Sequence, residues 1–158
     1  MKREIGESKD HHSNRLFISR SGSMYRSLQE RHKKAGIAPI ADSLATFRRW
    51  LHGQIGTPCE YCQKILTVKE CSIDHPTPLS RGGDGTITVI CPHDNKAKGQ
   101  FTREEYTALR ESLAALDALF PEGKILKQVI HSLHIANIFR IGIGVKAKRA
   151  KETKVATQ

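Results

Sequence analysis

Residues 72–83 read SIDHPTPLSRGG, and the interpretation of the middle of the chain depends on this stretch. The ECSID run that leads into it predicts a short β-strand, and the prolines and paired glycines predict a loop after it. Asp74 and His75 therefore stand at a strand end. Such a pair is a metal site, a catalytic base with its orienting group, or two ordinary polar residues.

The segments around this stretch predict a small α+β fold, in which a short antiparallel hairpin is flanked by N-terminal and C-terminal helices. ILTV (65–68) and ECSID (70–74) read as two short strands or one bent hairpin, and TITVI (86–90) reads as a further strand. DNKAKG (94–99) is short and could open a helical turn. The centre of the chain is therefore expected to consist of short strands and turns, unlike its helical ends.

Helical periodicity dominates the two ends of the chain. Helices are predicted over residues 23–36, with Ser23 as N-cap, and over 38–53, with Pro39 in the first turn. A capping-box pattern of Thr102 and Glu105 begins the clearest helix, over 102–120, and an apolar helix follows over 124–142. We expect five segments: a basic flexible arm (1–22), N-terminal helices (23–53), a central motif (54–101), C-terminal helices (102–144) and a basic disordered tail (145–158).

The charge of the chain predicts a polyanionic partner. The formal net charge is +10, with nine Lys and Arg against four acidic residues in 1–35 and five against one in 146–158. Residues 54–99 balance at five against five. Basic ends around a neutral centre favour nucleic acid, and an anionic membrane surface is the weaker alternative. The basic side chains expected at the nucleic acid are Lys33, Lys34, Arg48, Arg49, Arg81, Lys96 and Lys98.

The start of the chain and its cysteines predict a cytoplasmic protein, in a bacterium or a phage-infected host. MKREIGESKDHHSNR lacks the apolar core of a signal peptide, and no apolar run reaches transmembrane length. Thiols stay reduced in that compartment, so the four cysteines are expected to be metal ligands or buried thiols.

A zinc site is predicted from the spacing of three cysteines. CEYC supplies Cys59 and Cys62, and two intervening residues let both thiolates reach one tetrahedral ion from a tight turn. Cys91 follows about 30 residues later. Asp94 stands where a fourth cysteine would be expected, and His93 is the competing fourth ligand. The alternative is that the site has decayed and the cysteines are idle, which is the interpretation favoured for Cys71.

The chemistry of a phosphodiesterase could be supplied by three residues near the opening stretch. Hydrolysis needs an activated water, a Lewis acid on the phosphate and stabilisation of the leaving oxygen. His75 offers a base near neutral pH. Asp74 and Asn95 offer a carboxylate and an amide oxygen that suit one hard divalent cation.

Taken in order, CEYC, SIDHPTPLSRGG and TITVICPHDNKAKG resemble the motif of the HNH endonucleases, which build a ββα-metal active site. The resemblance covers about 59–99, under a third of the chain. It implies that His75 is the general base, that Asp74 and Asn95 bind a catalytic Mg²⁺ or Mn²⁺, and that Lys98 contacts phosphate. It also implies a structural Zn²⁺ on Cys59, Cys62 and Cys91.

Two positions depart from the family's pattern. Thr86 stands where the family usually has a central Asn that fixes the loop and the orientation of the catalytic His. Asp94 stands where zinc-bearing members have Cys. It is expected either to bind the zinc or to lie near the catalytic ion.

The resemblance implies a metal-dependent DNA endonuclease, of phage or mobile-element type, that nicks or cuts DNA with little sequence preference. The alternative is an HNH-like zinc module that binds DNA with little or no catalysis. RNA as the substrate is a third, weaker possibility. A homodimer or a phage terminase are the expected protein partners.

Overall fold

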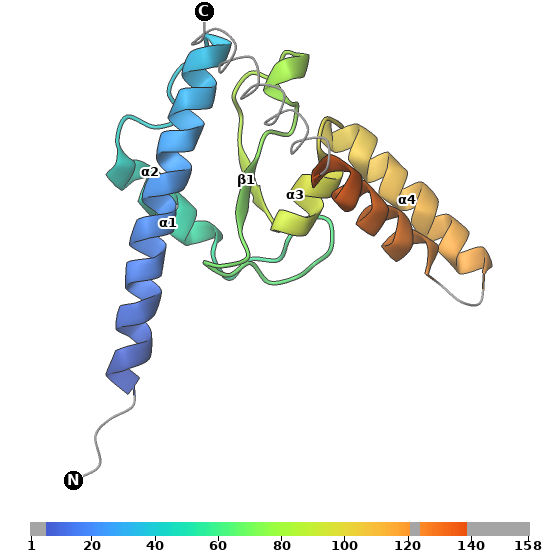
Figure 1. The fold of residues 1–158 in the computed structure, drawn as a ribbon, viewed down its shortest axis with the longest axis horizontal. Coiled ribbons are helices and arrows are strands. Elements are labelled where there is room, and N and C mark those ends of the chain that lie inside the picture. Colours follow the sequence, from blue (N-terminus) through green and yellow to red (C-terminus); the bar gives the residue numbers. More distant parts are fainter. Residues whose placement is uncertain (1–5, 121–123, 139–158) are drawn as a thin grey trace, which may run out of the picture. The chain divides into compact units, whose positions relative to one another are not determined.

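The computed structural model describes residues 6–120 and 124–138, and the chain divides into two compact units, Met1–Pro92 and His93–Gln158. The described residues combine helices with one two-stranded antiparallel hairpin (Figure 1). The predicted α+β class is therefore confirmed.

The first unit begins with α1, a helix over Gly6–Ala35. The predicted flexible arm over 1–22 is therefore wrong for residues 6–22, which are helical, and residues 1–5 lie outside the described part of the chain. Ser23 lies inside this helix, not at its start, so its predicted role as N-cap is wrong as well.

The inward face of α1 explains why the full length of the helix was not predicted. Leu28 on this face is fully buried and Phe17 packs against the core, but Ser21 and His32 are buried on the same face with 0% and 2% exposure. These four positions recur at helical spacing. Because two of them are polar, the apolar period that normally marks a helix is too weak to read.

The second helix, α2, covers Leu44–Gln54 and packs against α1. It begins six residues later than predicted, because the Ser43 side chain accepts a hydrogen bond from the backbone N–H of Thr46 and caps the helix there. Phe47 and Leu51 are buried in the core, as their helical spacing predicts.

A polar clamp joins the two helices. Arg48 on α2 donates from Nε to Ser21 Oγ at 3.0 Å and from Nη2 to the carbonyl of Ile18 at 3.1 Å. The hydroxyl of Tyr25 on α1 donates to the carbonyl of Ala41 at 3.3 Å. These contacts fix α1 beside the chain that leads into α2.

The hairpin consists of β1 (Ser72–Asp74) and β2 (Thr88–Ile90), paired antiparallel with Asp74 opposite Thr88. The predicted strands ECSID and TITVI are thus confirmed in shortened form. ILTV forms no extended strand, and its Ile65 makes an isolated bridge with Pro58. The buried strand residues join the core of the first unit, which is formed by Leu28, Phe47, Leu51, Cys59, Leu66, Cys71, Ile73, Val89, Ile90 and Cys91.

Two helices, α3 and α4, begin the second unit. The first, α3, covers Pro92–Lys98, so it begins directly after Cys91 and continues across the boundary between the units. The second, α4, covers Arg103–Leu119, and the Thr102–Glu105 capping box is present with both of its hydrogen bonds. The predicted helix over 102–120 is confirmed almost to the residue.

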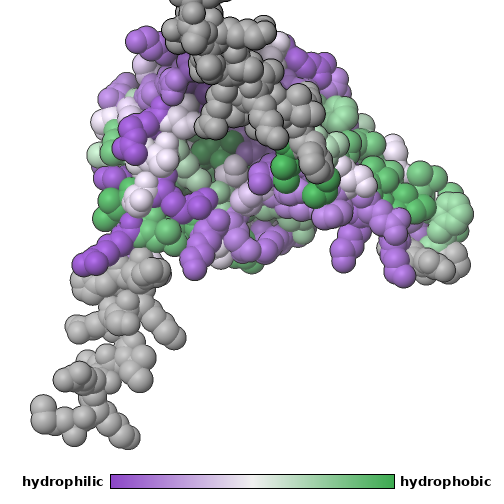
Figure 2. Space-filling view, in the orientation of Figure 1, coloured by the Kyte–Doolittle hydropathy of each residue, from purple (hydrophilic) through white to green (hydrophobic). Residues whose placement is uncertain are grey.

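A further helix covers residues 125–138, and the predicted continuation to 142 lies outside the described part of the chain. Its Asn137 amide donates to the carbonyl of Lys96 on α3 at 2.8 Å, and its Leu126 N–H donates to Asp117 Oδ1 on α4 at 3.1 Å. Apolar side chains gather on the surface of α4 toward its C-terminal end (Figure 2), where Leu119 is 75% exposed.

Among the described residues, no helix combines the length and the apolar character that crossing a membrane would need. The predicted tail over 145–158 lies outside the described part of the chain.

Candidate metal centre and Asp–His pair

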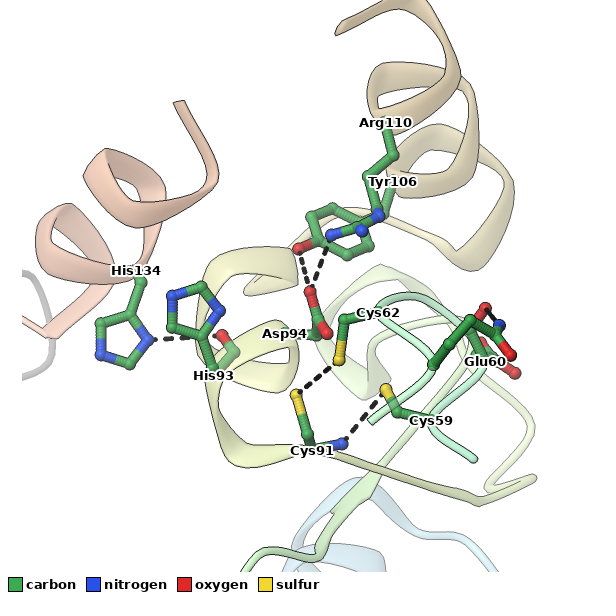
Figure 3. Close-up of polar contacts among 10 residues, drawn as sticks. Cys59, Glu60, Cys62, Cys91, His93, Asp94, Tyr106, Arg110 and His134 are labelled. Carbon is green, nitrogen blue, oxygen red and sulfur yellow. Dashed lines mark hydrogen bonds and ion pairs between the residues drawn. The ribbon is translucent and has the colours of Figure 1, made fainter. Parts of the chain in front are cut away.

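The CEYC segment forms the tip of a tight turn in the first unit. The Cys59 N–H donates to the carbonyl of Lys64 at 2.8 Å, and the Gln63 N–H donates back to the carbonyl of Cys59 at 2.9 Å. Gln63 has a φ of 60°, a left-handed conformation that closes the turn. This local geometry turns the side chains of Cys59 and Cys62 to the same side of the chain (Figure 3).

The third cysteine is brought to this turn by β2. The Sγ atoms of Cys62 and Cys91 lie 3.6 Å apart, and the N–H of Cys91 donates to Cys59 Sγ at 3.4 Å (Figure 3). All three sulfurs lie within 4.8 Å of one another. None of the three is in a disulfide. The predicted convergence of the cysteines is confirmed, and a metal ion could be held by them.

Hydrogen bonds to the sulfur of Cys59 favour its ionised form. A hydrogen bond with the Cys91 side chain lowers the pKa of Cys59 to about 5, and backbone N–H groups of Cys62, Cys91 and Tyr61 add to this against the opposing effect of burial. A thiol with such a pKa is a thiolate at neutral pH, which is the form that binds metals.

Cys71 takes no part in this cluster. It is 2% exposed, and its thiol donates to the carbonyl of Val68 at 3.6 Å. Burial raises the pKa of this thiol. Cys71 is therefore a packed, protonated thiol, as expected from the sequence.

Asp94, the predicted fourth ligand, belongs to the second unit and lies in the first turn of α3. Its Oδ1 accepts from the Tyr106 hydroxyl at 3.0 Å and from Arg110 Nη1 at 2.9 Å (Figure 3). Burial, together with the charge of Asp94, raises the pKa of Tyr106, so its hydroxyl remains a donor. The positive charge of Arg110 stabilises the ionised form of the buried Asp94 carboxylate.

His93, the competing ligand, is engaged within the second unit. Its ring stacks on that of His134, with centroids 4.7 Å apart (Figure 3). The ring of His131 lies 6.4 Å from that of His93. Burial lowers the pKa of His93, and the neighbouring His134 adds to the shift. These rings are stacked face to face, with interplanar angles of 9–16°.

Asp74 and His75 occupy the strand end that the sequence predicts. Asp74 is the last residue of β1, and His75 follows it. Their exposures are 6% and 7%, so a carboxylate and an imidazole are both held in the interior. Buried ionisable groups of this kind are uncommon unless they are bonded or functional.

The long helix α1 contributes a residue to this pair that the sequence interpretation missed. His32 Nε2 lies 3.1 Å from His75 Nε2, and the ring centroids are 5.3 Å apart. The sequence places His32 in the basic cluster RHKK (31–34), which is expected to contact the nucleic-acid backbone. The spacing of His32 from Leu28, at i and i+4, is the signal that could have placed it on the buried face.

Arg31, the neighbour of His32, is electrostatically linked to the same pair. Partial burial lowers the pKa of its guanidinium, and the negative charge of Asp74 acts in the opposite direction. The Asp–His pair therefore has a cation and an imidazole from α1 beside it.

The loop between the strands is held by Thr86 in an unexpected way. The Thr86 N–H donates to Asp84 Oδ1 at 2.8 Å, and Thr86's backbone and hydroxyl hydrogen bonds lower the pKa of Asp84. Thr86 is exposed, so the structure assigns it to the shape of the loop. Gly83 also matters here, because a Cβ at this position would lie 2.1 Å from the carbonyl oxygen of Thr77.

The remaining predicted residues of the motif lie on α3. Asn95 is half-buried, Lys96 is exposed and Lys98 is 1% exposed. A catalytic role for Asn95 and a phosphate contact by Lys98 stay predictions.

One of the predicted DNA contacts also has a role within the fold. Arg48 uses its guanidinium to join α2 to α1 through Ser21 and Ile18, and its contact with DNA stays a prediction. The sequence pattern could not separate it from Arg49, because the two arginines are adjacent in the chain. The other predicted basic contacts in the first unit are exposed, namely Lys33, Lys34, Arg49 and Arg81.

The chain matches no protein-family model, no curated protein and no solved structure. The chemistry open to this site follows from its residues. Three sulfurs offer a soft metal site, and a buried carboxylate next to an imidazole offers an oxygen ligand beside a base.

Proposed function

We propose that this chain is a metal-dependent endonuclease that resembles the HNH enzymes and hydrolyses DNA phosphodiester bonds. The observation that supports this most is that one hairpin carries both halves of the motif. β1 ends at Asp74 and leads into His75, and β2 leads into Cys91, whose sulfur meets those of Cys59 and Cys62. The helix α3 follows directly, which gives the β-β-α order of the resemblance.

Zinc is the metal that suits the cysteine cluster. Three thiolates, one of them with a strongly lowered pKa, form a soft donor set that selects zinc. Asp94 offers a carboxylate oxygen as the fourth ligand, three residues after Cys91. We favour it over His93 because the His93 ring is stacked against His134. This ion would be structural and would pin the CEYC turn to the end of β2.

A catalytic Mg²⁺ or Mn²⁺ fits the donor at the end of β1. Asp74 is a buried carboxylate, which is the hard oxygen ligand that these ions prefer, and Asn95 would supply an amide oxygen. A cation there would polarise the scissile phosphate and stabilise the leaving oxygen.

In this mechanism His75 takes a proton from the attacking water. Its position next to Asp74, with only 7% exposure, restricts the ring and keeps competing water away. The exposed Lys33, Lys34 and Arg49 would hold the DNA backbone without reading bases. The net charge of +10 supports this sequence-independent affinity.

Cleavage of supercoiled plasmid DNA tests the proposal. We expect nicked or linear product with Mg²⁺ or Mn²⁺ and none with EDTA, across a series that also includes Ni²⁺ and Zn²⁺. His75→Ala should lower the rate about 10²–10⁴-fold. His131→Ala, at an exposed histidine of the second unit, is the control and should cleave normally. Cleavage by His75→Ala at the wild-type rate would contradict the role of His75 as base.

Additional arms of the assay address substrate and assembly. Duplex DNA should compete for the enzyme better than single strands or RNA. Linear product that appears together with nicked circles would support a homodimer, whereas nicks that accumulate first would support a monomer. A terminase partner stays a prediction.

The second candidate function is a zinc module that binds DNA with little or no catalysis. It is favoured by Thr86, whose side chain is hydrogen-bonded to Asp84 at the position where the family uses Asn to fix the catalytic His. In that case binding would be sensitive to salt, no divalent ion would produce nicks, and Asp74→Ala would leave DNA affinity unchanged.

A further inference from the structure

The contact between His32 and His75 constrains where their protons lie. The two Nε2 atoms are 3.1 Å apart, so one of them donates and the other accepts. His32 Nδ1 lies 2.9 Å from the carbonyl oxygen of Ala38, which can only accept. His32 Nδ1 therefore carries a proton.

This assignment decides the tautomer of His75. In a neutral imidazole only one nitrogen bears hydrogen. Because the proton of neutral His32 is on Nδ1, its Nε2 is the acceptor toward His75. A neutral His75 must then donate from Nε2, and its Nδ1 is the nitrogen without a proton.

The surroundings of His32 hold its ring in this orientation. His32 is 2% exposed, and it lies at the last turn of α1, where its backbone carbonyl also accepts from the Ile37 N–H at 2.9 Å. Gly85 passes so close that a Cβ there would lie 3.0 Å from His32 Cε1, and its φ of 91° suits glycine. The helix end and the glycine loop leave the ring little freedom to flip.

We propose that His32 is a positioning residue that holds His75 in its Nε2-protonated tautomer, so that Nδ1 of His75 is the proton acceptor. This inference rests on the proposed nuclease function. It extends that function, because it draws the N-terminal helix, outside the stretch that resembles HNH enzymes, into the active site.

The proposed step balances as follows. Water gives one proton to His75 Nδ1, its oxygen bonds to phosphorus, and the bond from phosphorus to the 3′ oxygen breaks, with a solvent proton going to that oxygen. His75 becomes doubly protonated, and its Nε2–H continues to donate to His32. A fixed acceptor behind a base raises the basicity of the base and keeps its ring aligned.

Two variants separate positioning from folding. His32→Gln keeps a side-chain oxygen that can accept from His75 Nε2–H, whereas His32→Phe fills the buried site but offers no acceptor. We expect His32→Phe to lower kcat roughly 10- to 100-fold with little change in KM, the range typical for removing a group that orients a catalytic residue. His32→Gln should recover much of that loss.

The second readout is the ¹⁵N spectrum of the imidazoles in the purified protein without added Mg²⁺ or Mn²⁺ at about pH 8, where free histidine is neutral. We expect His75 to show a protonated Nε2 and a bare Nδ1 in the wild type and in His32→Gln, and a mixture of tautomers in His32→Phe. This measurement needs no cleavage, and its wild-type arm needs no variant to fold.

The outcomes distinguish the two proposals. A wild-type His75 that is protonated on Nδ1 would overturn the role of His32, and so would cleavage by His32→Phe at the wild-type kcat. If the wild type cuts no substrate but the tautomers behave as expected, the nuclease function fails and the positioning role for catalysis fails with it, while the hydrogen bond stands.

Discussion

Cys62 and Cys91 are 29 positions apart in the chain, and their Sγ atoms lie 3.6 Å apart. The approach depends on the CEYC turn and on β2, which begins far from that turn in sequence. These two thiols are not in a disulfide, and with Cys59 beside them they lie close enough together to hold a metal ion.

The first prediction is that removal of one sulfur from this cluster removes zinc. The purified wild type should carry about one Zn²⁺ per chain, and Cys62→Ser should carry almost none, measured by elemental analysis. Substitution with Co²⁺ should give the wild type the strong near-ultraviolet band of thiolate ligation. Cys62 is exposed, so the variant loses little packing.

Cys71 provides the control for the zinc prediction. Cys71→Ala also removes one thiol, but from a buried site outside the cluster. We expect normal zinc content and a lower melting temperature, because a packed side chain has been shortened. Equal zinc loss in both variants would argue against the cluster.

The second prediction separates two adjacent arginines. Arg48→Ala should destabilise the fold by roughly 1–3 kcal/mol, because its hydrogen bonds to Ser21 and Ile18 are lost. Arg49→Ala should leave stability unchanged, weaken DNA binding and reduce the slope of log K against log salt by about 1. Urea unfolding and salt-dependent binding measure the two effects. An unchanged stability of Arg48→Ala would contradict its role within the fold.

The sequence was informative where each element follows a strong local rule. The Thr102–Glu105 capping box, the β-branched TITVI run and the spacing of CEYC all act over a few residues, and all three appear in the structure. The class of the fold and the cysteine cluster could therefore be predicted.

The contribution of α1 to the candidate site could not be predicted, because it depends on packing between distant segments. His32 and His75 are 43 positions apart and belong to no shared local pattern. Ser21 and His32 are polar residues on the buried face of α1, so hydropathy does not identify that face as buried. Arg48 is also polar, and it forms a hydrogen bond between the two helices. Hydropathy predicts that such residues lie on the surface, and their buried positions become known only from the contacts in the folded structure.

The third prediction concerns the buried ion pair of the second unit. The side chain of Asp94 is 1% exposed and pairs with Arg110, whose side chain is 16% exposed. Arg110→Ala should cost about 3–5 kcal/mol, because it leaves a buried carboxylate without its cation. Tyr106→Phe removes one hydrogen bond to the same oxygen and should cost less, about 1.5–3 kcal/mol.

The neighbouring residue provides the control for that pair. Glu111→Ala changes an exposed position of α4 and should change stability by less than about 0.5 kcal/mol. Chemical denaturation of each variant measures the differences. An Arg110→Ala variant as stable as Glu111→Ala would show that Asp94 does not depend on this partner.

The fourth prediction tests the close approach inside the loop after His75. A Cβ on Gly83 would meet the Thr77 carbonyl oxygen at 2.1 Å, so Gly83→Ala forces the backbone apart and should cost roughly 1–3 kcal/mol. Gly53→Ala, at a position of α2 with open space, should stabilise by about 0.5–1 kcal/mol, as expected for alanine in a helix. Melting temperatures that move in the same direction would contradict the loop geometry.

The fifth prediction concerns Thr86, where the chain departs from the HNH pattern that it resembles. The N–H of Thr86 and its hydroxyl both bond to Asp84, and together they lower the pKa of that carboxyl. Thr86→Val removes only the hydroxyl, so the pKa of Asp84 should rise part of the way toward its ordinary value. Thr86→Ser keeps the hydroxyl and should leave the pKa of Asp84 in place. Carboxyl ¹³C titration measures both variants, and an unchanged pKa of Asp84 in Thr86→Val would show that the hydroxyl does not hold this loop.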